Sequence, residues 1–322
     1  MDSLYLVSNG VMVRKANSLT FVNKEGKRHL PIESVGDIYC LGRITLTSGA
    51  VSLLMKKNKP VHFFNFYGFY EGSLMPREAQ ISGLVVVKQV EHYSDPAKRV
   101  LIAREMVNGI RDNVNCTLKY YQRRGDELLP FIQRIEETQL GSSVPSILSG
   151  EGKIWDTYYE SLNVIVKEFE MKRREIRPPQ DEMNALISFG NSILYGVALS
   201  EIYHTYLHPA ISFLHEPGER RYSLALDLAD IFKPVIVERM IFKLVNNNQI
   251  TKDDFERDVG IVLKEKARRL FIAEFDGKLK TTVNHPNLKR PVSYREMIRL
   301  ECYKLVKHLI GEKKYHVFRM WW

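Results

Sequence analysis

The pattern of apolar and polar residues changes its period once along the chain. Up to about residue 85, short apolar runs alternate with turn residues, as in "LYLVSNGVMVRK", "SLTFVNKEGKRHLPI", "VGDIYCLG" and "PVHFFNFYG". Runs of this length between turn residues are typical of β-strands. The Asn9-Gly10 pair predicts a two-residue hairpin turn, and residues 24 to 27 predict a second turn. The segment "TSGAVSLLMKKN" predicts one short helix that begins near Thr47 or Ser48.

From about residue 86 the period is that of helices. The segment "SDPAKRVLIAREMVNGIRDNVNCTLKYYQRRG" has Ser94 in the N-cap position and Pro96 near the first turn. Apolar stripes at helical spacing recur in "EGKIWDTYYESLNVIVKEFEMKRR", "DEMNALISFGNSILYGVALSEIYHTYLH", "SLALDLADIFKPVIVERMIFKLVNN" and "SYREMIRLECYKLVKHLIG". The sequence therefore predicts an α+β protein. We expect a small β-rich domain at residues 1–85 and a larger all-helical domain at residues 86–322, with a hinge between Gly83 and Ser94.

Composition and charge narrow the classes of function. The chain of 322 residues has 47 Lys and Arg against 38 Asp and Glu, a net charge of +9. A basic protein favours a polyanionic partner, because Lys and Arg that face phosphates release condensed counterions. Cys40, Cys116 and Cys302 lie far apart without a C-x-x-C pair, which argues against a zinc ribbon or a disulfide framework. No signal-peptide pattern and no apolar run of about 20 residues is seen. We therefore expect a cytoplasmic protein with no membrane partner.

The absence of common catalytic motifs from the sequence argues against several other functions. Neither the phosphate-binding pattern G-x-x-x-x-G-K-[ST] nor a strand-linked G-x-G-x-x-G occurs, which argues against ATP-driven and NAD-dependent chemistry. His204 and His208 have the spacing of a zinc pair, but Thr205 stands where the zinc peptidase pattern H-E-x-x-H requires Glu.

Three carboxylates and one histidine border the apolar stripes. We expect Glu151 to open its helix, and the i, i+3 spacing of Asp227 and Asp230 places both on adjoining parts of one helix surface. His215 ends the apolar run before "EPG". Taken singly, each has a structural explanation. Glu151 fits a first-turn acid favoured by the helix dipole, the two aspartates fit first-turn acids behind a cap at Ser223, and the histidine fits a hydrogen-bonded structural residue. Taken together, one Glu, one His and one Asp form a ligand set that suits Mg²⁺ or Mn²⁺. Such an ion can polarise a phosphoryl oxygen and activate a water or a 3′-hydroxyl.

Basic residues lie near these acids in the sequence. Arg220 and Arg221 stand between the histidine and the two aspartates, Lys233 follows them, and Arg173 and Arg174 belong to "KRREIR". A solvated face is the ordinary explanation of such charges. Beside a metal site they become candidate contacts to DNA phosphates. Positive charge at such a site suits a phosphodiester substrate better than a peptide.

Three blocks of the sequence resemble a known family. They are "GEGKIWDTYY" (150–159), "RPPQDEMNALISFGNSILYG" (177–196) and "HPAISFLHEPGERRYSLALDLADIFKPVIVERMIF" (208–242). In this order, after a small β-domain, they resemble the CRISPR adaptation integrases, the Cas-one family. The resemblance implies that Glu151, His215 and Asp230 are the metal ligands, with Asp227 as the supporting acid. Many members have Glu at the position of Asp230 and Arg at that of Lys233, so a point charge replaces a planar phosphate clamp here.

The resemblance also implies an activity and partners. The expected function is that of a metal-dependent DNA endonuclease and integrase, which inserts captured DNA fragments into a CRISPR array by 3′-hydroxyl attack on phosphodiester bonds. The expected partners are DNA, a second copy in a homodimer, and the small Cas-two protein. Two alternatives stay open: a structure-specific nuclease that cleaves DNA or RNA without joining strands, and a non-catalytic DNA-binding scaffold.

Overall fold

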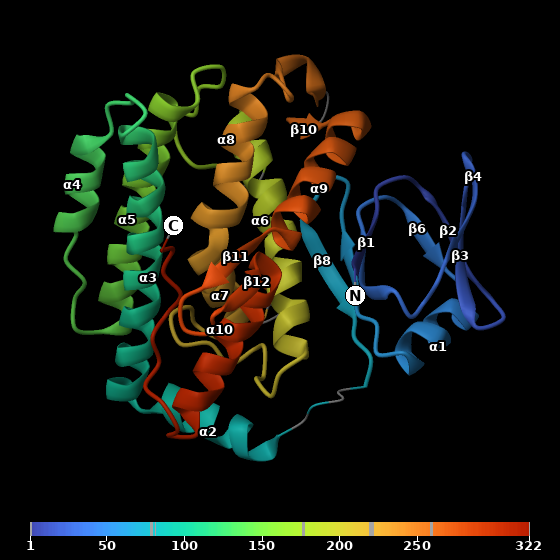
Figure 1. The fold of residues 1–322 in the computed structure, drawn as a ribbon, viewed down its shortest axis with the longest axis horizontal. Coiled ribbons are helices and arrows are strands. Elements are labelled where there is room, and N and C mark those ends of the chain that lie inside the picture. The colour runs from blue at the N-terminus through green and yellow to red at the C-terminus, as the bar shows by residue number, and fades with distance from the viewer. Residues whose placement is uncertain are drawn as a thin grey trace.

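The computed structural model describes residues 2–77, 80, 82–175, 178–218, 222–257 and 260–321. The strands gather at the N-terminal end of the chain and the long helices follow, so the predicted α+β class is confirmed. Figure 1 shows the strand-rich region, in blue, at one side of the helices.

Eight N-terminal strands form two four-stranded sheets. One sheet has the order β1 (Asp2–Leu6), β5 (Val35–Cys40), β7 (Val61–Phe64), β8 (Tyr70–Leu74), and only its last pair is antiparallel. The other has the order β4 (Gly26–Leu30), β3 (Ser18–Asn23), β2 (Gly10–Lys15), β6 (Ile44–Leu46). Helix α1 (Ser48–Lys56) begins behind Thr47, as predicted.

Side chains alternate across the first sheet because successive residues of a strand face opposite sides. On β5, Ile38 and Cys40 share a core with residues of the second sheet and α1. Tyr39 instead belongs to the core that the helices form, together with Phe64 of β7. The first sheet therefore lies between the second sheet and the helices, and its two buried faces join the two parts of the protein.

The predicted hairpin at Asn9-Gly10 is wrong. Strand β1 pairs with β5 and strand β2 pairs with β3, so the two strands belong to different sheets. Gly10 is needed for close packing rather than for a turn, because a Cβ there would lie 2.5 Å from the ring of Phe21. Asn9 Oδ1 accepts a hydrogen bond from the backbone N–H of Arg43 at 2.8 Å. The second predicted turn is confirmed: β3 and β4 pair antiparallel, and Gly26 has a φ of +135°.

The rest of the chain is mainly helical. Its helices are α2 (Gly83–Ser94), α3 (Pro96–Gln122), α4 (Leu129–Glu137), α5 (Val144–Ile165), α6 (Glu182–Tyr203), α7 (Ser223–Lys233), α8 (Arg239–Asn246), α9 (Glu265–Lys280) and α10 (Tyr294–Leu309). A π-helical turn (Pro234–Glu238) joins α7 to α8, and a short 3₁₀-helix spans Lys252–Asp254. Asp95, not Ser94, caps α3, since its side chain accepts from the N–H groups of Ala97 and Lys98. The proposed domain boundary at residues 85 and 86 falls within α2, and the division into two domains stays a prediction.

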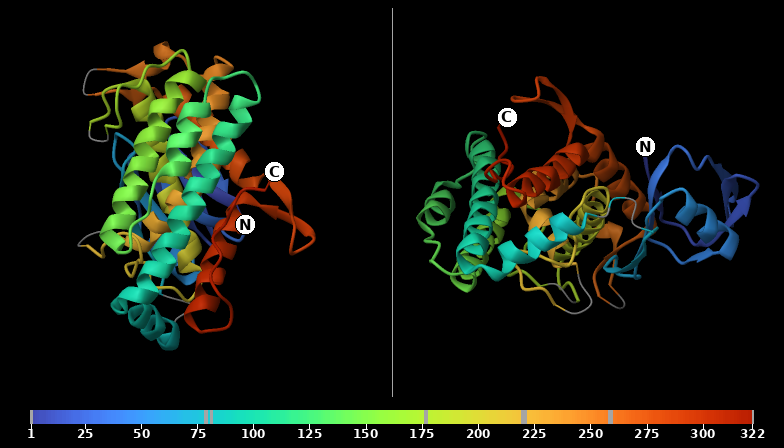
Figure 2. Two further views of the ribbon diagram at one scale, coloured as in Figure 1. Left: turned by 90° about the vertical axis from the view of Figure 1, so that its left-hand side faces the viewer. Right: turned by 90° about the horizontal axis from the view of Figure 1, so that it is seen from below.

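The sequence predicted an all-helical C-terminal part, and this prediction is wrong. Two short antiparallel pairs interrupt it, formed by β9 (Phe255–Glu256) with β10 (Val262–Leu263) and by β11 (Thr282–His285) with β12 (Arg290–Ser293). Strands of two to four residues are too short to show a clear alternation in the sequence. Figure 2 shows the β11–β12 hairpin standing out from the helical body.

Helix α6 passes through the middle of the protein. Its length and composition are those of a helix that could cross a bilayer, which corrects the expectation that no apolar run has this length. However, 89% of its most apolar 18-residue window is buried inside the protein. This burial is that of a core helix in a large helical domain.

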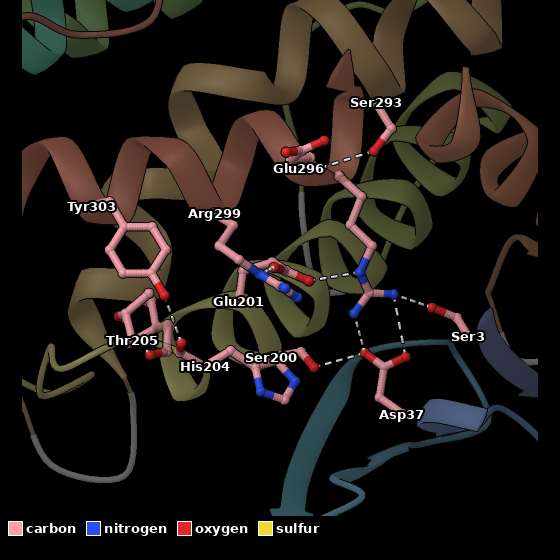
Figure 3. Close-up of polar contacts among 12 residues, drawn as sticks. Ser3, Asp37, Ser200, Glu201, His204, Thr205, Ser293, Glu296, Arg299 and Tyr303 are labelled. Atoms are coloured by element: carbon pink, nitrogen blue, oxygen red, sulfur yellow. Dashed lines mark hydrogen bonds and ion pairs between the residues drawn. The ribbon is translucent and has the colours of Figure 1, made fainter. Parts of the chain in front are cut away.

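A buried ionic network fixes the strand-rich region against the helices (Figure 3). Arg295 of α10 donates to Asp37 of β5 and to Glu201 of α6, each at 2.6 Å. Arg299 donates to the second oxygen of Glu201 at 2.5 Å, and Ser200 donates to Asp37 at 2.7 Å. Both acids are fully buried. Burial works against the charge of Asp37, but the Arg295 guanidinium outweighs it and holds the pKa of that carboxyl well below its usual range.

Candidate active site

Glu151 lies inside helix α5 rather than at its start. The helix begins at Val144 behind the Ser143 cap, whose side chain accepts from the N–H of Ser146, so Glu151 lies about two turns further on. Glu151 is only 7% exposed, and Trp155 Nε1 donates a hydrogen bond to Glu151 Oε1 at 2.5 Å. The first turn of α5 carries no acid, so favourable placement in the helix dipole does not explain this carboxylate.

Asp227 holds the loop that carries His215. One carboxylate oxygen accepts from the backbone N–H groups of Phe213 at 2.8 Å and Leu214 at 2.9 Å. The other accepts from the backbone N–H of His215 at 3.0 Å and pairs with its Nδ1 at 2.8 Å. Asp227 is fully buried on α7, and both of its oxygens are engaged. Because a carboxylate accepts here, Nδ1 carries the proton and Nε2 is the ring nitrogen left for a ligand.

Asp230 faces the same region from the next turn of α7. It is almost fully buried, and its Oδ1 contacts the ammonium of Lys233 and no other described hydrogen-bond donor. That ammonium also lies 5.3 Å from the centre of the Trp155 ring. Helix α7 has no acid in its first turn, so the first-turn explanation also fails for Asp230.

The charge of Asp230 acts on both Glu151 and His215. Burial and the nearby Asp230 charge raise the pKa of Glu151 to about 7. Burial opposes the charged form of His215, but the hydrogen bond to Asp227 and the Asp230 charge outweigh it and raise the pKa of His215 to about 9. Two buried carboxylates that repel each other are stabilised by a cation between them.

This donor set fits a divalent cation. Two carboxylates and the Nε2 of a histidine are ligands that Mg²⁺ or Mn²⁺ accepts. In the part of the chain that the structure describes, no three His, Cys, Asp or Glu side chains are already grouped as ion ligands. The ammonium of Lys233 instead lies on Asp230 Oδ1, at one of the oxygens that an ion would need.

The candidate DNA-binding residues have different environments. Arg220 and Arg221 lie outside the described residues. Arg173 is exposed and donates to Glu175 at 2.6 Å. Arg174 reaches inward, where it donates to Asn184 Oδ1 at 2.8 Å and to Ser188 Oγ at 3.0 Å. Of the two candidate arginines that the structure describes, Arg173 is the one that presents its charge mainly to solvent, and its contact with DNA stays a prediction.

Glu238 is a carboxylate near this site that the sequence analysis missed. It ends the π-helical turn, is fully buried, and neither of its oxygens accepts a hydrogen bond from any other described residue. Burial raises its pKa to about 7, and the charge of Lys233 is the largest influence in the opposite direction. In "KPVIVERM" it looks like an acid on the surface of a helix. Its position among Val235, Ile236 and Val237 is the only signal of burial that the sequence offers.

The chain is similar in sequence to proteins of CRISPR systems. The family described as "CRISPR associated protein Cas1" matches residues 4–277. CRISPR-associated endonuclease Cas1 3 of Thermodesulfovibrio yellowstonii is 46% identical over 325 residues, with 100% of both chains covered. CRISPR-associated endonuclease Cas1 of Fusobacterium nucleatum is 45% identical and covers 99% of this chain and 97% of its own.

Solved structures share the fold. TM1797, a Cas1 protein from Thermotoga maritima, superposes with a TM-score of 0.88 at 39% identity, covering 99% of this chain and 100% of that one. A casposase bound to an integration product superposes with a TM-score of 0.86 over 98% of this chain and 93% of that one. At 22% identity, the second likeness shows the fold alone.

Proposed function

Since the chain belongs to the Cas1 family, we propose that it is a metal-dependent DNA endonuclease and integrase of CRISPR adaptation. The proposal rests above all on one observation. Glu151 of α5, His215 of the loop before α7 and Asp230 of α7 lie close enough for the charge of Asp230 to act on both other groups; Glu151 and Asp230 are buried and His215 is half-buried. The relatives named above are described as endonucleases.

Glu151, Asp230 and the Nε2 of His215 would hold Mg²⁺ or Mn²⁺. When bound, such an ion neutralises charge on a phosphoryl oxygen and favours ionisation of the attacking hydroxyl. The chain contributes the orientation of these ligands. Asp227 fixes the histidine through the Nδ1 contact and the loop through three backbone N–H groups, so that Nε2 keeps one direction. Trp155 fixes Glu151 Oε1 in the same way.

The proposed reaction is transesterification at phosphorus. A bond forms between the 3′-oxygen of a captured fragment and the phosphorus of the target strand. The bond from that phosphorus to the target's own 3′-oxygen breaks, and that oxygen takes a proton. Little covalent chemistry is required of the protein, so positioning and electrostatic stabilisation supply much of the rate.

The proposed partners are DNA, a second copy of the chain and a Cas2 protein. Support comes from the fold shared with a casposase on an integration product and with a chain of a Cas6-RT-Cas1–Cas2 complex, of which this chain matches 36%. The net charge of +9 also suits a DNA partner. The cytoplasmic location stays a prediction, in keeping with three cysteines that form no disulfide in the structure.

A branched DNA with one labelled strand tests this function. In the presence of Mn²⁺ and a Cas2 partner, we expect the protein to rejoin the strand and release the branch. The His215→Ala variant should give neither product. Cleaved ends without any joined strand would favour a nuclease that does not integrate. Unchanged binding and function in Glu151→Gln, with no dependence on divalent ions, would favour the scaffold.

A further inference from the structure

Glu238 is a buried carboxyl group in an unusual environment. It is fully buried, and neither carboxylate oxygen has a hydrogen bond from another described residue. The hydroxyl of Tyr158, which is also buried, has no described partner either. A buried carboxylate without a partner is costly, and native proteins keep such groups rarely. This side chain therefore calls for a partner that reaches it in another state of the protein.

The π-helical turn places Glu238 near Lys233. A π-helix bonds residue i to residue i+5, and such wide turns occur often at functional sites. Lys233 and Glu238 are five residues apart at the two ends of this turn, and Pro234 between them lacks an N–H to continue the α-helix. Of the charges around Glu238, that of Lys233 is the strongest one that favours its ionised form.

A divalent cation that binds to Asp230 Oδ1 would displace the Lys233 ammonium from its present position. The ammonium lies on Asp230 Oδ1, within a largely buried site and over the Trp155 ring. Two cations on one buried carboxylate oxygen would repel each other strongly. An ammonium that leaves Asp230 inside this buried site needs a second counter-ion.

We propose that Glu238 is this counter-ion: the Lys233 ammonium pairs with Asp230 in the structure seen here, and it moves to Glu238 when a divalent cation binds to Glu151, His215 and Asp230. Glu238 is then a positioning residue that acts through Lys233. The move clears Asp230 Oδ1 for the ion. The inference rests on the metal site of the proposed function and adds a residue that controls how tightly the site binds its ion.

A double-mutant cycle tests the link between the two residues. Mn²⁺ affinity is measured by calorimetry, at one fixed and slightly alkaline pH, for the unchanged protein, Glu238→Gln, Lys233→Met and the double variant. Glu238→Gln should weaken Mn²⁺ binding about tenfold, because the displaced ammonium has no counter-ion. Lys233→Met should tighten it, because the competing cation is gone. In the Lys233→Met background, Glu238→Gln should change the affinity less than about twofold.

Glu301→Gln is the matched control. Glu301 is also a fully buried glutamate, but Tyr315 OH, the N–H of Phe318 and Lys304 already satisfy it. This exchange should leave Mn²⁺ affinity unchanged, whatever it does to stability. Equal weakening by Glu238→Gln in both Lys233 backgrounds, or no weakening in either, would overturn the proposed role of Glu238.

Two further results separate this inference from the proposed function. If His215→Ala binds Mn²⁺ as the unchanged protein does, the metal site itself is wrong and both proposals fail. If binding requires His215 but shows no coupling between Lys233 and Glu238, only the role of Glu238 fails. A crystal structure of the unchanged protein with Mn²⁺ tests the inference without any variant. In it, Lys233 Nζ should lie within 4 Å of a Glu238 oxygen. An ammonium that stays on Asp230 beside the bound ion would contradict the inference.

Discussion

Replacing Asp227 by Asn tests whether this acid is a structural support rather than a metal ligand. The carboxylate accepts from three backbone N–H groups and pairs with the ring of His215. An Asn keeps one oxygen and replaces the other by an NH₂ group, which faces N–H donors at either end. If the NH₂ group faces Phe213 and Leu214, two hydrogen bonds are lost. If it faces His215, the ring can change its tautomer and accept, and only the backbone bond is lost.

The structure gives the size of the effect. A hydrogen bond to a charged group contributes about 1.5–3 kcal/mol, so one to two lost bonds cost about 3 kcal/mol. In a chain of this size that lowers the melting temperature by about 4 °C. A second effect depends on pH. The raised pKa of His215, about 9 against the usual 6.5, stabilises the fold fully below pH 6.5, and this contribution is lost as the pH rises through 9. Asp227→Asn removes the main cause of the raised pKa, so the difference in stability from the unchanged protein should narrow between those two values.

Thermal unfolding in a metal-chelating buffer at several pH values measures both effects, and NMR titration of the His215 ring follows its pKa directly. Glu151→Gln is the control, because it makes the same exchange of carboxylate for amide at the same site but loses no hydrogen bond from Trp155. It should not destabilise the protein. An Asp227→Asn protein that melts like the unchanged one, with the pKa of His215 still near 9, would refute the reasoning.

Three further predictions follow from the charges. The pKa of Glu151 is about 7 against the usual 4.5, so this group destabilises the metal-free protein as the pH rises from 4.5 through 7, by about 3 kcal/mol above pH 7. In urea unfolding, Glu151→Gln should therefore be more stable than the unchanged protein by up to that amount at pH 8, and equally stable at pH 4. A variant that is less stable at pH 8 would contradict this prediction. Mn²⁺ at about a hundred times its Kd should stabilise the protein by about 2.7 kcal/mol in thermal unfolding, and an equal gain in His215→Ala would show that the ion binds elsewhere. Arg295→Met leaves the buried Glu201 and Asp37 without their main partner, and it should lower the free energy of unfolding in urea by about 3–5 kcal/mol. The more exposed Arg299→Met should cost clearly less, and similar losses in the two variants would contradict the assigned role of the network.

The sequence predicted all three proposed ligands, and two of them lie within one short segment. Asp227 and Asp230 share a helix surface because of their spacing alone, and the segment also contains His215. Their separate roles depend on the loop before α7, which folds back so that three N–H groups meet Asp227. No pattern of residues shows that fold, and apart from the family resemblance the two aspartates look equivalent in the sequence.

The errors have local physical causes. Glu151 was placed at a helix start because the apolar stripe is clear only from that point, whereas Ser143 and Pro145 mark the true start upstream. Asn9-Gly10 has the composition of a hairpin turn, but Gly10 is required by the Phe21 ring. Glu238 gives no clear signal in the sequence because α3, α6 and α9 pack against the π-helical turn, and burial of that kind arises only from tertiary packing.

The position of Mn²⁺ in crystals of this protein tests the central claim most directly. Anomalous scattering at the manganese edge locates the ion without reference to any assumed ligand. We predict one strong peak within bonding distance, about 2.0–2.3 Å, of a Glu151 oxygen, His215 Nε2 and an Asp230 oxygen. A peak elsewhere, or none between these three side chains at saturating Mn²⁺, would contradict the account.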